Sequence, residues 1–172
     1  MFSAWKKQDS FQNIDKALLS AAGMGDILKV QHLLAINADI NVQDGNGWTP
    51  LHRAIDGRHK EVVKLLIYKE ADVTVKDFTD HSTPLHWIEG KEEAELLIIH
   101  GADVNARNRT GFTPLHLAVM GECLEVAELL IINGAIITAK TDEGWTAFSI
   151  ARRRHYTEIA AILSRYQNGK ET

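Results

Sequence analysis

Apolar residues recur at the spacing of a helix face in several short stretches of the chain. The stretches 62–66 and 126–130 each place apolar residues at positions i, i+1, i+3 and i+4, which is typical of an amphipathic helix. Gly134 follows the second stretch, and glycine supplies the left-handed residue that commonly ends a helix. Polar, glycine-containing turns at 44–47 and 108–111 separate such stretches. The pattern predicts short helices joined by tight turns.

The sequence Thr-Pro-Leu-His occurs three times, beginning at Thr49, Thr83 and Thr113, and a degenerate copy begins at Thr146. Successive copies are 34, 30 and 33 residues apart. Threonine at an N-cap accepts a hydrogen bond from a backbone N–H of the first turn. Proline at the next position loses no bond, because that N–H has no partner within a helix. Each copy therefore predicts the start of a helix.

A second marker, Ala-Asp followed by an aliphatic residue and Asn or Thr, accompanies these copies. The two markers together define five repeating units. The units span about 14–44, 45–77, 78–107, 108–140 and 141–168, after a lead-in at 1–13 and before a tail at 169–172. The third unit lacks three residues around 90–93, so we expect one of its helices to be shortened.

With a period near 33 residues and the Thr-Pro-Leu-His motif, the chain resembles the ankyrin repeat family over about residues 14–166. The resemblance implies an all-α solenoid of five stacked helix-turn-helix units, each carrying a β-turn finger, in a single domain at 14–168. Such a unit cannot bury its apolar face alone, so the end units need polar outer positions. Polar residues of this kind occur in the first unit at Lys16, Asp26, Lys29 and Gln31, and in the fifth at Arg152, Arg153, Arg154, Glu158 and Arg165.

Alignment of the units places Asn37, Glu70, Gly101 and Gly134 at the residue that ends the outer helix in the left-handed conformation. Glycine and asparagine tolerate this conformation, whereas glutamate is strained there by roughly 1 kcal/mol. The second unit therefore either carries this strain or closes its helix in another way.

Composition and charge restrict the classes of function. The formal net charge is −4, and the chain has neither a basic stripe for nucleic acid nor an apolar run long enough for a membrane span or a secretory signal. Cys123 is the single cysteine, which excludes an intramolecular disulfide and favours a reducing compartment. We therefore expect a monomer of the cytoplasm or nucleus that associates with no membrane, while a secreted bacterial effector stays open.

The charges are unevenly distributed along the chain. Residues 61–100 contain four lysines and nine acidic residues, whereas residues 152–154 are three consecutive arginines. A solvated surface explains such runs by default, and with a partner present the asymmetry would mainly orient its approach.

No combination of residues indicates catalysis, a cofactor or a metal. Eight histidines are present, and three of them, His52, His86 and His116, belong to the repeat motif, which in the resembled family implies hydrogen bonds to neighbouring loops. The others form no i, i+4 pair with a carboxylate, as zinc proteases require. Cys123 has no evident base beside it, and no glycine-rich phosphate loop occurs. We expect no catalytic residue, metal ligand or cofactor.

Aromatic residues precede the threonine in three units, and the resemblance places these finger positions beside the inner helices along a concave groove. Trp87 differs in size from its counterparts Arg53, Leu117 and Ile150. The alternative is that each finger ring packs on its own finger and that Trp87 packs in the core. The residues predicted to contact a partner are Trp48, Arg53, Asp56, His81, Trp87, Phe112, Met120, Trp145 and Arg153, with His81 and Ser82 at the finger position in the third unit.

The function that these observations predict is non-catalytic protein recognition through the concave groove, as a regulator, adaptor or effector, with another protein as the partner. The alternatives are a self-associating structural unit and a binder of nucleic acid or of a small molecule. A net charge of −4 disfavours nucleic acid.

Asn41 and Asn105 end a Leu-x5-Asp-x-Asn pattern. They resemble asparagines that an asparaginyl hydroxylase modifies in some animal ankyrin proteins. A structural role in the loop is the alternative.

Overall fold

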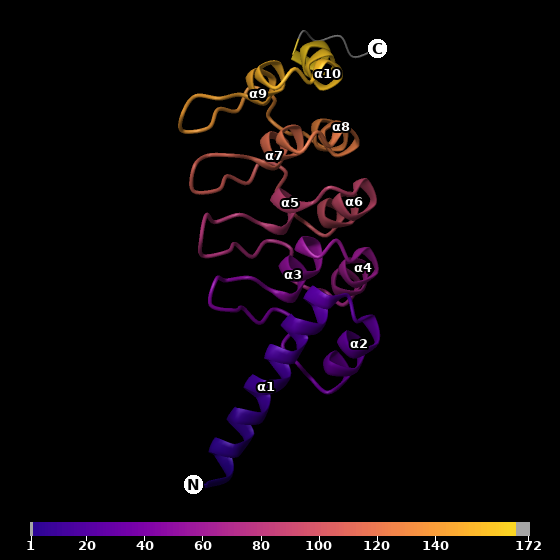
Figure 1. The fold of residues 1–172 in the computed structure, drawn as a ribbon, viewed down its shortest axis with the longest axis vertical. Coiled ribbons are helices and arrows are strands. Elements are labelled where there is room, and N and C mark those ends of the chain that lie inside the picture. Colours follow the sequence, from indigo (N-terminus) through magenta and orange to yellow (C-terminus); the bar gives the residue numbers. More distant parts are fainter. Residues whose placement is uncertain (1, 168–172) are drawn as a thin grey trace. The chain divides into compact units, whose positions relative to one another are not determined.

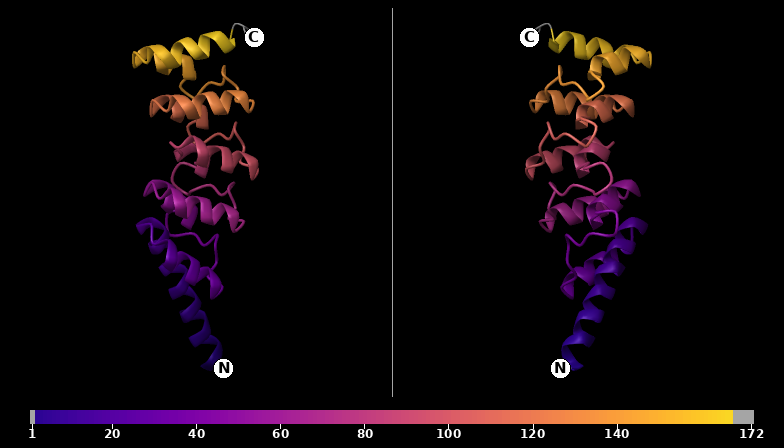
Figure 2. Two further views of the ribbon diagram at one scale, coloured as in Figure 1. Left: turned by 90° about the vertical axis from the view of Figure 1, so that its right-hand side faces the viewer. Right: turned by 90° about the vertical axis from the view of Figure 1, so that its left-hand side faces the viewer.

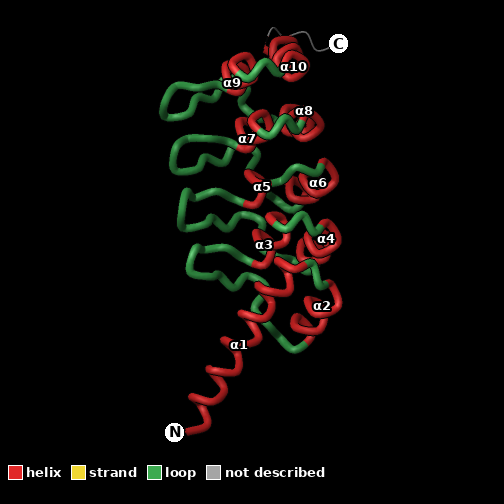
Figure 3. The backbone as a smooth tube through the Cα atoms, viewed as in Figure 1, coloured by secondary structure: helices red, strands yellow, loops and turns green. Residues whose placement is uncertain are grey.

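The computed structural model describes residues 2–167, with side chains described from residue 13 onward. These residues form ten α-helices and contain no strand, so the predicted all-α class is confirmed; Figure 3 shows the helices joined by long loops. The chain divides into two compact units, Met1–Thr79 and Asp80–Thr172, called unit 1 and unit 2 below.

Unit 1 contains two helix pairs. Helices α1 (Phe2–Met24) and α2 (Ile27–Ala35) form the first, and α3 (Pro50–Asp56) and α4 (Lys60–Tyr68) form the second. The inner helix α1 packs against α3, and the outer helix α2 packs against α4. Helix α1 begins at Phe2, so it continues without a break from the predicted lead-in into the first repeat (Figure 1).

Unit 2 contains three helix pairs, which are stacked as successive layers (Figure 2). Its inner helices α5, α7 and α9 pack in that order, and so do its outer helices α6, α8 and α10. The fingers of this unit project from the inner helices on the side away from the outer helices (Figure 1). The bounds are α5 Pro84–Trp87, α6 Lys91–Ile99, α7 Pro114–Met120, α8 Leu124–Ile132, α9 Ala147–Arg153 and α10 Thr157–Gln167.

The Thr-Pro pairs begin inner helices, as the sequence predicts. Thr49, Thr83 and Thr113 are N-caps with extended backbone, and proline follows each at the first helical position. The N-cap of α9 is Thr146, whose hydroxyl accepts the backbone N–H of Ser149 at 3.1 Å. Such a cap stabilises a helix by about 1 kcal/mol, which matters for helices of only two turns.

The inner helix of the third repeat is shortened, which confirms the prediction from the 30-residue spacing. Helix α5 has four residues, whereas α7 and α9 each have seven. In the other repeats a residue with positive φ turns the chain from the inner to the outer helix, at Gly25, Arg58, Glu122 and His155. In the third repeat Ile88 and Gly90 are both extended instead. The missing residues thus removed the last turn of α5 together with the left-handed turn.

The predicted left-handed ends of the outer helices are confirmed. The φ angles are 65° at Asn37, 63° at Glu70, 95° at Gly101 and 88° at Gly134. Glu70 therefore carries the backbone strain that the alignment predicts, which amounts to roughly 1 kcal/mol.

Each unit buries a row of leucines between its inner and outer helices. Leu18, Leu51 and Leu66 are fully buried in unit 1, and Leu85, Leu115 and Leu130 are at most 1% exposed in unit 2. The polar residues predicted to cap the first and last repeats are all exposed. Fully burying one leucine contributes about 1.5–3 kcal/mol, so these rows supply much of the stability of each unit.

Candidate functional site

The finger of unit 1 is held by one carboxylate. Oδ1 of Asp44 accepts the backbone N–H groups of Asn46 at 2.8 Å and of Trp48 at 3.0 Å. The N–H of Asp44 in turn donates to the carbonyl of Trp48 at 3.0 Å. Gly47 has a φ of 77°, the left-handed conformation that lets the turn close. This arrangement fixes the backbone that carries the Trp48 ring.

A cation lies over the Trp48 ring. The guanidinium carbon of Arg53, from α3, lies 5.2 Å from the ring centroid. Nε of the same arginine donates to Oδ2 of Asp44 at 3.0 Å, and the two side chains also form an ion pair. The Arg53 side chain is 39% exposed and that of Asp44 is 16% exposed. Arg53 is therefore accessible at the surface, while the carboxylate that holds it is mostly buried.

The pKa of Asp44 reflects these contacts. Burial alone would raise the pKa of this carboxyl. The backbone hydrogen bonds from Trp48 and Asn46 and the charge and hydrogen bond of Arg53 outweigh burial, and the pKa lies below its ordinary value of 3.8. Asp44 is therefore ionised at neutral pH, which keeps Arg53 in place over the ring.

A second Trp–Arg pair occurs in unit 2. The guanidinium carbon of Arg153, at the end of α9, lies 4.9 Å from the centroid of Trp145. Nε1 of Trp145 donates to Oε2 of Glu143 at 3.0 Å, and its backbone N–H donates to Oγ1 of Thr141 at 3.1 Å. Different positions of the repeat thus produce the same combination of a half-buried tryptophan, an arginine and a finger carboxylate.

The finger that carries Phe112 holds its ring against a histidine of the inner helix. The Phe112 ring packs edge-on against His116, with the centroids 5.7 Å apart. Oδ1 of Asn108 accepts the N–H of Phe112 at 2.9 Å, as Asp44 does in unit 1. Trp48 likewise stacks on His52, with the centroids 6.3 Å apart. Trp48 and Phe112 thus pack against the histidines of their own inner helices, and Trp48, Phe112 and Trp145 are all partly exposed.

His81 does not extend this aromatic row. Ser82 directly precedes Thr83, takes the aromatic position and is fully buried. His81 has a φ of 61° and takes the position that Gly111 has in the next finger. Its Nε2 lies 3.2 Å from Nη2 of Arg109, so it links two adjacent fingers. The sequence pattern does not distinguish these two residues, because this finger is one residue longer than the others.

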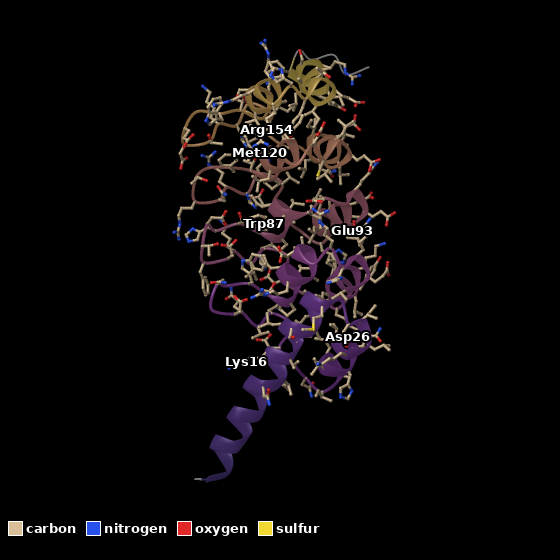
Figure 4. All side chains as sticks on the ribbon, in the orientation of Figure 1. Lys16, Asp26, Trp87, Glu93, Met120 and Arg154 are labelled. Carbon is tan, nitrogen blue, oxygen red and sulfur yellow. The ribbon has the colours of Figure 1, made fainter. Side chains whose placement is uncertain are left out.

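Trp87 is 45% exposed, so the alternative that it packs in the core is wrong. Met120, at the end of α7, is half-buried, while Asp56, at the end of α3, is exposed. Figure 4 shows Trp87, Met120 and Arg154 along the inner helices of unit 2. The structure thus brings Trp87, Met120 and Arg153 onto the inner helices of one unit, and Arg53 and Asp56 onto α3 of the other.

Two of the motif histidines, His86 and His116, connect fingers, as the resemblance implies. The N–H of Thr113 donates to Nδ1 of His116 at 3.2 Å, so Nε2 carries the proton and donates to the carbonyls of Ala139 at 3.1 Å and Trp145 at 3.2 Å. His86 lies between Thr83 and the carbonyl of Phe112 in the same way. Burial lowers the pKa of His116 below its ordinary value of 6.5, and Arg107 lowers it further, against the opposing effect of the two carbonyls. The structural interpretation is confirmed for His86 and His116, whereas the bonds of His52 Nδ1 with Thr49 lie within its own repeat.

Asn41 and Asn105 have structural roles in the loops. Oδ1 of Asn41 accepts the backbone N–H of Asp72 at 2.8 Å, and Oδ1 of Asn105 accepts that of Ile136 at 2.8 Å. Each therefore joins its loop to the loop of the following repeat.

The part of the chain that the structure describes contains no cluster of three or more His, Cys, Asp or Glu side chains that could hold a metal. Within the same residues, every helix is too short or too polar to cross a bilayer. Cys123 is half-buried, with Sγ 3.5 Å from the carbonyl oxygen of Gly121.

The carboxylates that support the two tryptophans, Asp44 and Glu143, were not predicted. The sequence does contain a sign of them, because Asp44 and Glu143 are acidic residues in the two fingers that carry a tryptophan. Their contacts depend on side-chain conformations, which the repeat period does not specify.

Repeated pairs of an inner and an outer helix, joined by fingers that hydrogen-bond to their neighbours, define a helical repeat protein. The family model for ankyrin repeats (3 copies) matches residues 4–77, 70–141 and 88–172. The chain belongs to the ankyrin repeat family, which confirms the predicted family and the all-α repeat fold. Ankyrin repeats generally mediate protein–protein interactions and are typically non-catalytic.

Individual relatives share parts of this chain. It is 35% identical over 98 residues to the 85/88 kDa calcium-independent phospholipase A2 of Mus musculus, which covers 56% of this chain and 12% of that protein. It is 37% identical over 87 residues to alpha-latrotoxin-Lg1a of Latrodectus geometricus, a match that covers 48% of this chain and 6% of that protein. It is 40% identical over 93 residues to the ankyrin repeat and KH domain-containing protein mask-1 of Caenorhabditis elegans, a match that covers 52% of this chain and 4% of that protein. The chain thus spans about an eighth or less of these relatives.

Proposed function

We propose that this chain is a non-catalytic recognition module that binds another protein through the inner face of each unit. The inner face is the surface formed by the fingers and by the exposed residues of the inner helices, which corresponds to the concave groove of the sequence prediction. Binding there would let the chain act as a regulator, an adaptor or an effector. The general role of ankyrin repeats in protein–protein interaction supports this proposal.

The observation that carries the proposal is the pair of partly exposed tryptophans, each beneath an arginine. Tryptophan and arginine are the residue types most enriched among those that dominate binding energy. The contacts of Asp44 with Arg53 and of Glu143 with Trp145 hold these side chains in place before a partner arrives. A surface ordered in advance loses less conformational entropy on binding.

The inner face of unit 2 adds apolar contact area to these pairs. Trp87 is 45% exposed, and Met120 and Phe112 are partly exposed. A flexible methionine beside aromatic rings suits a surface that adapts to its partner. The proposed contact residues are Trp48, Arg53 and Asp56 in unit 1 and His81, Trp87, Phe112, Met120, Trp145 and Arg153 in unit 2.

The charges near Trp145 favour an acidic segment of the partner. Arg152, Arg153 and Arg154 are all exposed at the end of α9. Such a cluster accelerates association with an acidic segment and orients it, and added salt weakens both effects. We propose a monomer acting in the cytoplasm or nucleus, for which the single cysteine is the supporting observation.

A comparative capture experiment tests this function. The full chain, the double variant Trp48→Ala/Trp145→Ala and the outer-helix control Tyr68→Ser are immobilised and exposed to the same lysate, and bound proteins are quantified by mass spectrometry. The proposal predicts at least one protein that the full chain and the Tyr68→Ser control retain and the double variant loses. Equal retention of every captured protein by all three would contradict binding through the inner face. Circular dichroism of each variant verifies that the fold is kept.

A further inference from the structure

Two outer helices of unit 2 carry the same surface pattern. Each helix carries two glutamates and an isoleucine in the same spacing. The second glutamate lies three residues after the first, and the isoleucine lies seven residues after the first glutamate. Residues with this spacing lie on one face of a helix. We name this surface the outer face of unit 2; it consists of Glu92, Glu95 and Ile99 on α6 and of Glu125, Glu128 and Ile132 on α8.

The two isoleucines of the outer face are unusually exposed. Ile99 is 70% exposed and Ile132 is 71% exposed, although each is the last residue of a helix that packs against the other. Figures 1 and 2 show α6 and α8 side by side. Packed helices lie about 8–10 Å apart, so equivalent residues on them form rows that cross both helices. The outer face thus has one apolar row and two acidic rows.

The two helices that carry the outer face have a negative formal charge. Helices α6 and α8 together contain five glutamates and one lysine, and of the five only Glu93 is buried. The C-terminal ends of both helices, where the isoleucines lie, add the partial negative charge of the helix dipole. Cations are therefore favoured around the apolar row.

The equivalent positions of the other outer helices lack this combination. In α4 they are Glu61, Lys64 and Tyr68, with Nζ of Lys64 4.0 Å from Oε1 of Glu61. In α10 the first and third of these positions are Glu158 and Arg165. Stacking of repeats alone therefore does not require the acidic and apolar rows of α6 and α8.

We propose that the outer face of unit 2 binds a basic amphipathic helix of a partner protein, as a second surface beyond the inner face. Two residues seven positions apart on a helix are about 10.5 Å apart along its axis, which is close to the separation of packed helices. Apolar residues at positions i and i+7 of the partner helix cover Ile99 and Ile132. Its lysines and arginines lie opposite the two rows of glutamates. The complementarity of charge and the match of spacing both select this occupant.

A peptide of defined pattern tests this surface without knowledge of the natural partner. The probe is a fluorescein-labelled 18-residue peptide of leucine, lysine and alanine, with leucines on one helix face and lysines on the other. The control is a scrambled peptide of the same composition. Fluorescence anisotropy with the full chain is expected to give a Kd about tenfold lower or more for the patterned peptide. Equal affinity for both peptides would overturn the proposal, because it would show charge attraction alone.

Variants locate the site. Ile99→Ser with Ile132→Ser is expected to raise the Kd about tenfold or more, and Glu95→Gln with Glu128→Gln about fivefold with a weaker salt dependence. The matched controls Tyr68→Ser and Glu61→Gln occupy equivalent positions on α4 and should leave the Kd unchanged. An unchanged Kd in both outer-face variants, or an equal rise in Trp145→Ala, would overturn the proposed site.

Amide chemical-shift perturbation of the unaltered chain by the patterned peptide provides a test that needs no variant. The largest changes are expected in α6 and α8, and largest changes elsewhere would overturn the proposal. Light scattering tests whether a second copy of the chain, rather than a partner helix, covers the outer face. A mass that rises with concentration, and that Ile99→Ser with Ile132→Ser returns to that of a monomer, would assign the outer face to self-association instead.

Discussion

Glu70 has a left-handed backbone at the position where two other repeats have glycine. Glu70→Gly removes the strain imposed by the Cβ, while the more flexible unfolded chain opposes the gain. We expect the free energy of unfolding to rise by about 0.3–1 kcal/mol, measured by chemical denaturation. Glu70→Gln is the control for charge and should leave the stability nearly unchanged. A glycine variant less stable than the glutamine variant would contradict the strain.

His116 makes stability depend on pH. Its folded pKa lies below the ordinary value of 6.5, chiefly because of burial, so the unfolded chain binds the proton more readily. The stabilising contribution is complete above pH 6.5 and is lost as the pH falls through the folded pKa. We expect the unfolding free energy to fall between pH 7 and pH 5, and to fall less steeply in His116→Gln. Denaturation curves with parallel pH dependence in the two proteins would contradict this role.

Gly90 lies against the buried carboxylate of Glu93. A Cβ at this position would overlap the carboxylate and would lie 2.9 Å from its carbon atom Cδ. Because Glu93 is only 2% exposed, it has little room to move. We expect Gly90→Ala to destabilise the protein by about 1–3 kcal/mol in denaturant titrations. The control Gly45→Ala, where no atom lies within 4 Å, should change stability little; equal effects of both substitutions would refute the overlap.

Backbone features of single residues were predictable, whereas side-chain partners were not. The left-handed Glu70 follows from alignment of the repeats, because one backbone geometry recurs in each of them. The ion pair of Asp44 with Arg53 joins residues nine positions apart, and no periodicity indicates it. Which of His81 and Ser82 takes the aromatic position was not predicted, because an added finger residue shifts the register locally.

Helix α5, which the 30-residue spacing shortens, is the helix of unit 2 that we expect to open most readily. With four residues it has one turn, and the turn to α6 is extended rather than left-handed. Few internal hydrogen bonds protect such a helix from local opening. We expect amide hydrogen exchange at residues 85–95 to be faster than at the equivalent residues of α7 and α8, measured by mass spectrometry. Equal or slower exchange at 85–95 would show that the deletion is fully compensated.

Start signals explain which helices were predictable. The inner helices α3, α5 and α7 each begin at the proline of a Thr-Pro pair, as the sequence predicts. Helix α1 has no such signal at its start, so its extension to Phe2 was not predicted.

At the level of the whole protein, the repeat period predicted the family, because one motif recurs with nearly constant spacing. It did not predict the outer face of unit 2. That face depends on glutamates and isoleucines outside the core, and such positions are less constrained by stacking. Partner specificity therefore resides in the residues that the repeat pattern leaves variable.

Recognition of a partner protein through the inner face is tested most directly by the affinity of a captured partner for single inner-face variants. Purified partner is titrated into the full chain, Trp48→Ala, Trp145→Ala and the control Tyr68→Ser, and the Kd is measured by isothermal titration calorimetry. We expect at least one tryptophan variant to weaken binding by about 2 kcal/mol, near thirtyfold in Kd, while the control binds as the full chain does. An unchanged Kd in both tryptophan variants, with native circular dichroism, would contradict recognition through the inner face.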